Sequence, residues 1–409
     1  MEDLLFLAHR IPYPPNKGDK IRSYHLLKEL ARSYRVHLGA FVDTAEDRRY
    51  RGKLEDLCES VFLLDLHPLR ARVRSLSGLL RGEALSVPYY YDRHMQAWVD
   101  SLLARSQLQR IFVFSSPMSQ YVMDVEGRSV RRVIDFVDVD SDKWRQYAER
   151  KSWPASWLYS REGRLLLRYE KAVAGRFDAS VFVSADEAAL CQRQAQEVSS
   201  RVGFLDNGVD HEYFSPDLDY KDPYAGNKAV LVFTGAMDYW ANIDAVSWFA
   251  RDIFPRIREM VTNVHFFIVG ARPTEDVLQL ATMAGVTVTG AVADIRPYLA
   301  HARAAVAPLR VARGTQNKVL EAMAMALPVL ATSAAVAGIE YDDPAGLQVT
   351  DSEEQFSAMA IELLQQAGSP PMLASREWVC QRYDWGVNLG KMYELLESVP
   401  GQSESLRRA

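Results

Sequence analysis

Short apolar runs of β type alternate with amphipathic stretches of helical period along almost the whole chain, and this alternation limits the available folds more than any other feature. It is typical of α/β domains with a parallel sheet, because each crossover helix returns the chain to the same edge of the sheet. The runs predict strands at 4–8, 36–42, 61–66, 111–115, 133–137, 180–184 and 202–205, and then at 230–234, 265–270, 286–289, 304–308 and 328–331.

Helical periodicity predicts the segments between these strands and the end of the chain. The clearest helices are expected at 20–33, 69–80, 93–103, 143–147, 158–175, 241–258, 316–326, 353–366 and 386–398. A polar stretch with Pro216 and Pro223 interrupts the alternation and predicts a linker at 211–227. With 409 residues the chain exceeds the size of one hydrophobic core. We therefore expect an N-terminal Rossmann-like domain at 1–210, a C-terminal one at 228–385, and a crossover helix with a tail at 386–409.

Composition and charge exclude several classes of protein. The three cysteines are far apart, which argues against zinc sites and redox dithiols. The acidic N-terminus does not fit a signal peptide, and the apolar runs are too short for a membrane span, so we expect a cytoplasmic chain. Residues 1–200 hold 31 basic and 27 acidic residues, and the remainder holds 17 and 26. This excess is too small for a nucleic-acid-binding protein, but a basic first half fits an anionic inner membrane surface.

The first loop that could carry chemistry follows the first predicted strand. Lys17, Gly18 and Asp19 lie at the entry of an amphipathic helix, where backbone amides and lysines suit an anionic donor or acceptor. The alternative is a proline-rich loop that only ends the strand.

A second loop begins at Gly235, directly after the strand predicted at 230–234. A glycine at this place lets a ligand approach the backbone, although a tight turn alone would also explain it.

The richest segment spans 308–331. A strand ends in a basic loop, a Gly-Thr pair opens a helix, and a lysine and a glutamate lie one turn apart on its face. Such a loop can bind a diphosphate and a ribose together, because cations and helix amides hold phosphate oxygens and a carboxylate accepts from ribose hydroxyls. The plain alternative is a surface ion pair. The predicted donor-binding residues are Gly235, Arg310, Gly314, Thr315, Gln316, Asn317, Lys318 and Glu321.

The strand predicted at 133–137 has an acidic end. Asp138-Val139-Asp140 has the Asp-any-Asp pattern of metal-dependent GT-A transferases, and two carboxylates suit magnesium or manganese. The same residues also fit the cap of the following helix.

The segment 308–331 resembles the donor-site signature of glycosyltransferase family 4. Asn207-Gly208-Val209-Asp210 resembles the segment that leads those enzymes into their second domain, and 10–23 resembles a subgroup associated with bacterial exopolysaccharide clusters. The resemblance runs essentially end to end. It implies a GT-B fold of two facing Rossmann-like domains, retention of anomeric configuration, no metal or other cofactor, and a donor held by the C-terminal domain.

Position by position, the resemblance gives roles to individual residues. Glu321 matches the second glutamate of the family's Glu-seven-residues-Glu motif, which binds the donor ribose. The first glutamate, which contacts the transferred sugar, falls on Arg313. The family's cations in the glycine loop are replaced here by Ala236, Ala241 and Asn242. We therefore expect Arg310, Arg313 or Lys318 to supply the charge. Asp138 is expected to orient the sugar or the acceptor hydroxyl, which makes Asp138 and Arg313 the predicted catalytic residues.

Residues 67–81 carry leucines with arginines around them, and 151–159 adds tryptophans beside a lysine. Two interpretations stay open: helices on an anionic membrane surface near a lipid-linked acceptor, or a domain helix that packs its leucines inward.

Together these features predict a retaining transferase that moves a sugar from a nucleotide-sugar donor to a glycan or lipid-linked acceptor. A nucleotide-sugar epimerase and a non-catalytic nucleotide-sugar-binding subunit are the alternatives. An oxidoreductase is disfavoured, because no Gly-x-Gly-x-x-Gly follows a predicted strand.

Overall fold

The computed structural model describes residues 1–105, 108–125, 130–149, 151–227, 229–312, 314–339, 346–366 and 372–397. The chain divides into two compact units. Unit 1 comprises Met1–Asp206 with Leu389–Ala409, and unit 2 comprises Asn207–Asn388. The segment 211–227, expected to be a linker, belongs to unit 2, where Phe214 and Tyr224 are buried.

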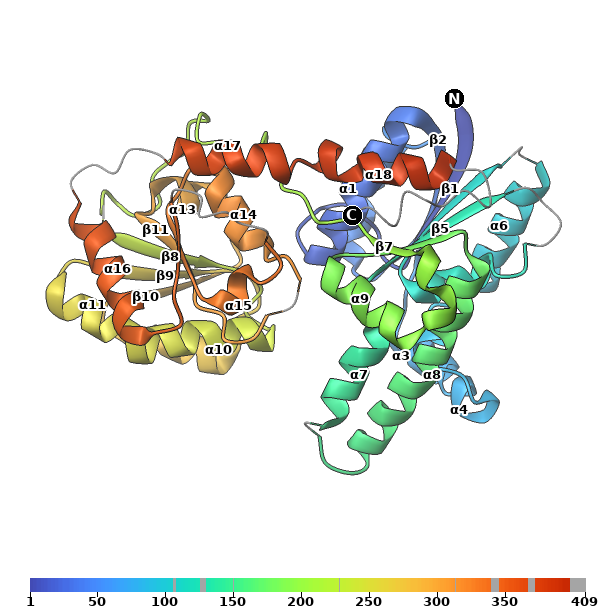
Figure 1. Ribbon diagram of the computed structural model, residues 1–409, viewed down its shortest axis with the longest axis horizontal. Coiled ribbons are helices and arrows are strands. Elements are labelled where there is room, and N and C mark those ends of the chain that lie inside the picture. Colours follow the sequence, from blue (N-terminus) through green and yellow to red (C-terminus); the bar gives the residue numbers. More distant parts are fainter. Residues whose placement is uncertain are drawn as a thin grey trace. The chain divides into compact units, whose positions relative to one another are not determined.

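In the described residues, unit 1 contains a seven-stranded parallel sheet in the order β3-β2-β1-β4-β5-β6-β7 (Figure 1). Residues 4–8 of the central strand β1 are wholly buried, as expected for a parallel sheet that is covered on both faces. The strands are β1 (Glu2–Ala8), β2 (Tyr34–Val42), β3 (Ser60–Asp65), β4 (Arg110–Phe114), β5 (Arg131–Val137), β6 (Ala179–Phe182) and β7 (Val202–Phe204).

Helices and 3-10 turns connect the strands of unit 1. The helices are α1 (Gly18–Ser33), α2 (Arg51–Glu55), α3 (Pro68–Ser75), α4 (Ser77–Arg81), α5 (Ser86–Tyr89), α6 (Arg93–Arg105), α7 (Asp140–Glu149), α8 (Ala155–Arg176) and α9 (Ala185–Gln194), and the 3-10 turns are η1 (Ala45–Tyr50), η2 (Ser116–Tyr121) and η3 (Gln196–Arg201). The helix α18 (Trp385–Glu397) begins in unit 2 and ends in unit 1. There the Glu397 carboxylate accepts hydrogen bonds from Tyr34 and Arg110, and Tyr393 donates to the Glu29 backbone carbonyl at 2.6 Å.

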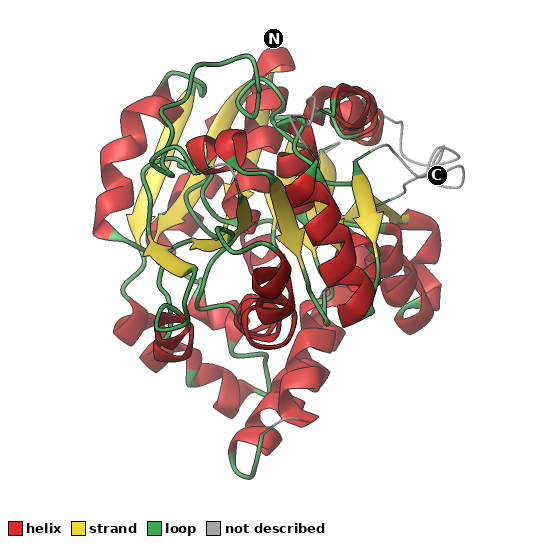
Figure 2. Ribbon diagram, turned by 90° about the vertical axis from the view of Figure 1, so that its left-hand side faces the viewer, coloured by secondary structure: helices red, strands yellow, loops and turns green. Residues whose placement is uncertain are grey.

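Unit 2 has a six-stranded parallel sheet in its described part, in the order β10-β9-β8-β11-β12-β13. In Figure 1, α13, α14 and α17 lie above its strands and α10 and α11 below them, and Figure 2 shows strands in yellow enclosed by helices in red. The strands are β8 (Val230–Thr234), β9 (His265–Val269), β10 (Val286–Gly290), β11 (Ala304–Ala307), β12 (Val329–Ala331) and β13 (Leu347–Val349). The helices are α10 (Trp240–Trp248), α11 (Phe254–Met260), α12 (Glu275–Leu280), α13 (Arg296–His301), α14 (Asn317–Ala324), α15 (Ser333–Val336), α16 (Glu353–Gln365) and α17 (Leu373–Arg382).

Each of the predicted strands is confirmed within one or two residues at its ends, and only the three-residue β13 was not predicted. The helix predicted at 241–258 is interrupted by a π-helical turn, η4 (Phe249–Ile253). Pro255 explains the interruption, because it has no N–H to donate to the preceding turn. The helix predicted at 69–80 is two helices, α3 and α4, joined at Leu76.

Both sheets follow one topology, in which strand order reverses beside the first strand of each unit. The reversal lies between β1 and β4 in unit 1 and between β8 and β11 in unit 2. In doubly wound sheets ligands bind outside the carboxyl ends of the strands at this switch point. The loops after β1, β4, β8 and β11 are therefore the places where a site is expected.

Candidate functional site

Close backbone packing shapes the loop after β8 in unit 2. A Cβ atom on Gly270, at the end of β9, would lie 1.7 Å from the Gly235 carbonyl oxygen. Only a glycine permits this approach, so Gly270 lets the Gly235 loop lie directly against the neighbouring strand end. The Gly235 loop is thus held at the carboxyl edge of the sheet.

Lys318, in the first turn of α14, reaches this loop. Its Nζ donates to Asn242 Oδ1 at 2.6 Å and lies 4.4 Å from the centre of the Phe233 ring. The same nitrogen is 3.4 Å from the position that a Cβ would take on Gly235. Burial lowers the pKa of Lys318 to about 7, and nearby Glu321 opposes part of this shift. The glycine loop therefore has a cation beside it that comes from α14.

Glu321 lies one turn after Lys318 on the same helix. No hydrogen bond or ion pair joins the two side chains in the described part of the chain, although their charges interact. Burial raises the pKa of Glu321 to about 7, and Lys318 counteracts this rise. Glu321 is thus a half-buried carboxylate next to a cation, and the Asn242 amide holds that cation. Such a carboxylate is suited to accept hydrogen bonds from a ligand's hydroxyl groups.

The loop that leads into α14 is anchored by a second glycine contact. A Cβ on Gly338 would lie 2.6 Å from the Gly314 carbonyl carbon, and Thr315 Oγ1 donates to the Gly338 carbonyl at 3.0 Å. The Gln316 side chain amide donates to the Gly314 carbonyl at 3.3 Å, and Asn317 Oδ1 accepts from Asn207 at 3.4 Å. These polar side chains fix the loop. Gln316 is the N-cap residue of α14, but its side chain accepts no hydrogen bond from the backbone amides of the first turn.

The two arginines of this loop differ from Lys318. Arg310 forms a two-bond ion pair with Asp244 of α10, one bond of 2.9 Å, and its guanidinium lies 5.4 Å from the Trp248 ring. The charge of Arg310 is thus already compensated by Asp244. Arg313 lies outside the described residues. Of the three expected cations, the structure thus brings Lys318 to the Gly235 loop.

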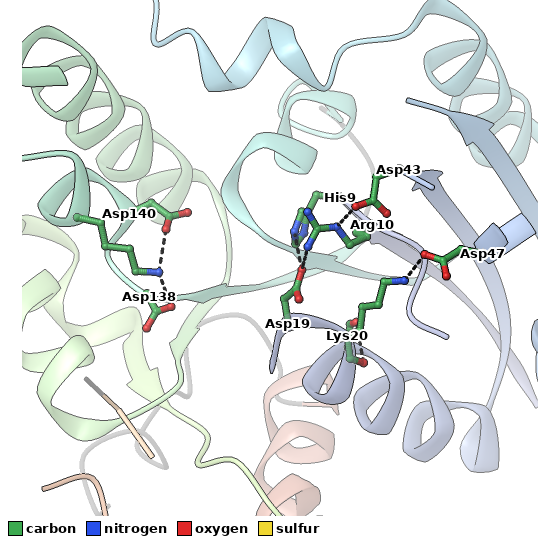
Figure 3. Close-up of polar contacts among 10 residues, drawn as sticks. His9, Arg10, Asp19, Lys20, Asp43, Asp47, Asp138 and Asp140 are labelled. Atoms are coloured by element: carbon green, nitrogen blue, oxygen red, sulfur yellow. Dashed lines mark hydrogen bonds and ion pairs between the residues drawn. The ribbon is translucent and has the colours of Figure 1, made fainter. Parts of the chain in front are cut away.

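In unit 1 the switch point is occupied by paired charges (Figure 3). Arg10, directly after β1, contacts Asp19 at 2.5 Å and Asp43 at 2.9 Å, and His9 lies 3.5 Å from Asp19. Burial would raise the pKa of Asp19, but the hydrogen bond from His9 and the charges of His9 and Arg10 lower it. Beside this cluster the buried Lys20 contacts Asp47 at 2.5 Å.

The predicted residues of this loop start α1. Lys17 is the N-cap residue and makes no side-chain cap, whereas Gly18 is exposed and a Cβ there would meet no atom within 4 Å. Asp19 is engaged by Arg10. The sequence prediction missed His9 and Arg10, although their position immediately after the first strand was a usable signal.

Asp138 and Asp140 share one cation. Lys143 Nζ lies 2.6 Å from Asp138 Oδ2 and 3.3 Å from Asp140 Oδ1 (Figure 3). Burial alone would lower the pKa of Lys143. The two carboxylates raise this pKa by more than burial lowers it, so it lies above that of an ordinary lysine. An ammonium group therefore bridges the two carboxylates of the Asp-any-Asp sequence, and the described residues contain no group of three or more metal-ligating side chains.

Two residues of unit 1, one of them directly before Asp138, have strained backbone dihedral angles. Ser115, after β4, and Val137, at the end of β5, have φ of 77° and 71°. Such a φ is uncommon for any residue other than glycine, is rarest for β-branched residues such as Val137, and costs on the order of 1–3 kcal/mol. Asp135 holds both residues: its Oδ1 accepts from Val137 N at 2.8 Å and its backbone carbonyl accepts from Ser115 N at 2.7 Å. Asp135 is itself wholly buried in an ion pair with Arg22 at 2.8 Å, a pair that no local sequence pattern indicated.

Part of the chain matches a known protein family. Residues 228–366 match the family described as Glycosyl transferases group 1. No curated protein matches the sequence at a significant level.

Solved structures resemble the chain over nearly its whole length. HepE of Anabaena, solved with UDP and glucose, has a TM-score of 0.64 at 16% identity, over 98% of this chain and 100% of that one. WaaG, a glycosyltransferase involved in lipopolysaccharide biosynthesis, has a TM-score of 0.59 at 16% identity, over 97% and 100%. TarM of S. aureus, in a complex that contains UDP, has a TM-score of 0.63 at 10% identity, over 97% and 100%. The fold is thus that of GT-B proteins with two Rossmann-like domains, and the family match in unit 2 supports a glycosyltransferase.

Proposed function

We propose that the chain is a retaining glycosyltransferase that moves a hexose from a nucleotide-sugar donor to a glycan or lipid-linked acceptor in exopolysaccharide biosynthesis. The observation that carries the proposal is the position of Lys318 beside the Gly235 loop, with Glu321 one turn further on. HepE has been solved with UDP-glucose, which favours a UDP-sugar as donor.

In this assignment unit 2 holds the nucleotide. Lys318 and the backbone amides of the Gly235 and Gly314 loops bind the diphosphate, and Glu321 accepts hydrogen bonds from the ribose hydroxyls. A diphosphate supplies a negatively charged partner at ion-pair distance, which Lys318 does not have among the described residues. Binding therefore restores the charged form of a lysine whose pKa burial has lowered.

The reaction needs no nucleophile supplied by the protein. The bond between the anomeric carbon and the diphosphate breaks, the acceptor oxygen bonds to that carbon on the same face, and the acceptor proton passes to the departing phosphate oxygen. Lys318 stabilises the charge that develops on the diphosphate. The rest of the catalytic effect comes from positioning. No metal takes part in this route.

The acceptor side is assigned to unit 1. Asp138 keeps one oxygen, Oδ1, outside its ion pair with Lys143, and it follows the strained end of β5. We assign it the orientation of the acceptor hydroxyl or the sugar.

A product assay tests the transferase assignment. The full chain is incubated with UDP-, GDP-, ADP- or dTDP-hexoses, with and without a glycan acceptor and with and without magnesium. We expect a glycosylated acceptor and free nucleoside diphosphate in equal amounts, independent of magnesium. A rearranged sugar without acceptor would instead identify an epimerase, and binding without turnover would identify a non-catalytic subunit.

Glu321→Gln tests the nucleotide site separately. Loss of a charge-assisted hydrogen bond should weaken UDP binding by about tenfold or more, measured by calorimetry. Glu362→Gln, an exposed change on α16 of the same unit, is the matched control. Equal affinities of the two variants for UDP would contradict the assignment of Glu321 to the ribose hydroxyls.

A further inference from the structure

Helices α3 and α4 present their large apolar side chains outward. Leu69, Val73 and Leu80 are 76%, 70% and 92% exposed, and Leu76 between them is 54% exposed. Leu69 and Val73 lie one turn apart on α3, and Leu76 and Leu80 lie four residues apart where the chain passes into α4. The opposite face consists of the small residues Ala71, Ser75 and Gly78, which are buried. The interpretation that these leucines pack inward is therefore wrong.

Anchoring to unit 1 fixes this orientation. Arg161 of α8 donates to the Gly78 carbonyl at 2.8 Å, and a Cβ on Gly78 would lie 3.2 Å from the Glu83 carbonyl oxygen. The buried Glu162 accepts from the backbone N–H of Leu85 at 2.7 Å. Because the small face is held by these contacts, the leucines cannot turn inward without breaking them.

A second set of exposed side chains lies at the start of α8, the helix that holds α4 through its buried face. Trp157 is 59% exposed and stands one turn before Arg161 on α8, the residue that contacts α4. Trp153, at 80% exposure, and the exposed Lys151 precede it. Figure 1 shows α4 and the ends of α7 and α8 projecting from the same end of unit 1.

The charges within the segment 67–81 are of one sign. Residues 67–81 contain four arginines and no acidic residue. Arg70, Arg72 and Arg81 are exposed, whereas Arg74 is engaged with the Pro88 and Tyr89 carbonyls. Leucines that face outward between arginines, together with exposed tryptophans at the start of α8, match the chemistry of a bilayer interface, where apolar groups enter the acyl boundary and arginines meet anionic headgroups.

We propose that α3, α4 and the N-terminal end of α8 form a docking surface for an anionic lipid bilayer. A second copy of the chain fits less well, because a symmetric contact through this surface would place the arginines of both copies face to face. None of the described helices is both long and apolar enough to cross a bilayer. The contact is therefore with the membrane surface.

Vesicle co-sedimentation of the full chain tests this surface. Vesicles of phosphatidylcholine alone are compared with vesicles in which about one third of the lipid is phosphatidylglycerol. The assay contains neither donor nor acceptor, so its outcome does not depend on the proposed transferase activity. We expect binding to the anionic vesicles only, and this binding should weaken as salt is added.

Two groups of variants locate the contact. Leu76→Ser with Leu80→Ser should lower the vesicle partition coefficient by about tenfold or more, because two leucines no longer enter the interface. Arg70→Gln, Arg72→Gln and Arg81→Gln should each lower it by about fivefold. Leu278→Ser, at a leucine of α12 in unit 2 that is 50% exposed, is the matched control. Unchanged thermal unfolding shows that each variant is folded.

Three results would overturn the proposal. One is the absence of binding to anionic vesicles at low salt. Another is equal binding by the leucine variants and the Leu278→Ser control. The third is a dimer in analytical ultracentrifugation that dissociates on Leu80→Ser, which would assign the surface to a second copy.

Discussion

Two lysines at the two sheet edges have opposite surroundings. Lys143 of unit 1 lies between Asp138 and Asp140, which raise its pKa in spite of burial. Lys318 of unit 2 contacts an amide and an aromatic ring, and burial lowers its pKa to about 7. The first charge is neutralised within the protein, whereas the second is neutralised only when an anion arrives. This difference is the reason why we propose the edge of unit 2 as the diphosphate site.

The same contrast extends to the other charges. At the switch point of unit 1, Arg10 and Lys20 each have carboxylate partners, while in unit 2 Arg310 has one and Lys318 has none within 4 Å among the described residues. Paired charges keep a loop rigid and resist a competing ion. We therefore expect changes in unit 1 to affect stability most, and changes at Lys318 to affect ligand binding.

The largest effect is expected at the buried pair of unit 1. Arg22→Met leaves the Asp135 carboxylate buried without its partner and should destabilise the protein by about 3–5 kcal/mol in denaturant unfolding. The double variant Arg22→Met with Asp135→Leu should recover much of this loss, because it buries no charge. Arg35→Met, which breaks an exposed pair with Asp3, should cost less than about 1 kcal/mol. Similar losses of unfolding free energy for Arg22→Met and Arg35→Met would contradict the inference that the buried pair matters more for stability than the exposed one.

The next effect separates the two lysines. Lys318→Met should weaken nucleotide-sugar binding by about 10- to 100-fold, because a charge-assisted contact to phosphate is lost. The same change should leave the stability of the free protein unchanged or raised, since it removes a partly buried cation that has no carboxylate within 4 Å among the described residues. Lys143→Met should show the opposite pattern: it should destabilise unit 1 and have little effect on nucleotide-sugar binding. Calorimetric titration and thermal unfolding measure both, with Lys221→Met as an exposed control.

The pH dependence of donor binding sharpens the contrast further. Lys318 loses its proton above about pH 7 and Glu321 gains one below about pH 7. Affinity should therefore be greatest near neutrality and fall on both sides, by up to about tenfold for each pH unit. Lys318→Met should remove the alkaline decline and Glu321→Gln the acid decline. A flat profile in the wild-type protein would show that neither group titrates on binding.

The smallest effect is expected for Arg310→Met. Because Asp244 already compensates this guanidinium, donor affinity should change by less than about threefold. A loss as large as that of Lys318→Met would mean that Arg310 leaves Asp244 for the phosphate.

Sequence periodicity predicted the architecture well, because parallel strands and their helices are encoded by local runs of apolar residues. It placed Lys318 and Glu321 on one helix face for the same reason. It could not show that Arg310 pairs with Asp244, which is 66 positions away, or that Lys143 bridges Asp138 and Asp140. The outward leucines of α3 and α4 were also ambiguous, since amphipathicity does not reveal which face the fold covers.

The helix α18 has a consequence for how the protein is made. Unit 1 needs Tyr393 and Glu397 for its contacts with Glu29, Tyr34 and Arg110, yet unit 2 lies between these two parts of the sequence. Because a ribosome synthesises a chain from its N-terminus towards its C-terminus, residues 207–388 of unit 2 emerge before Tyr393 and Glu397 do. Unit 1 can therefore form these contacts only after unit 2 has been synthesised.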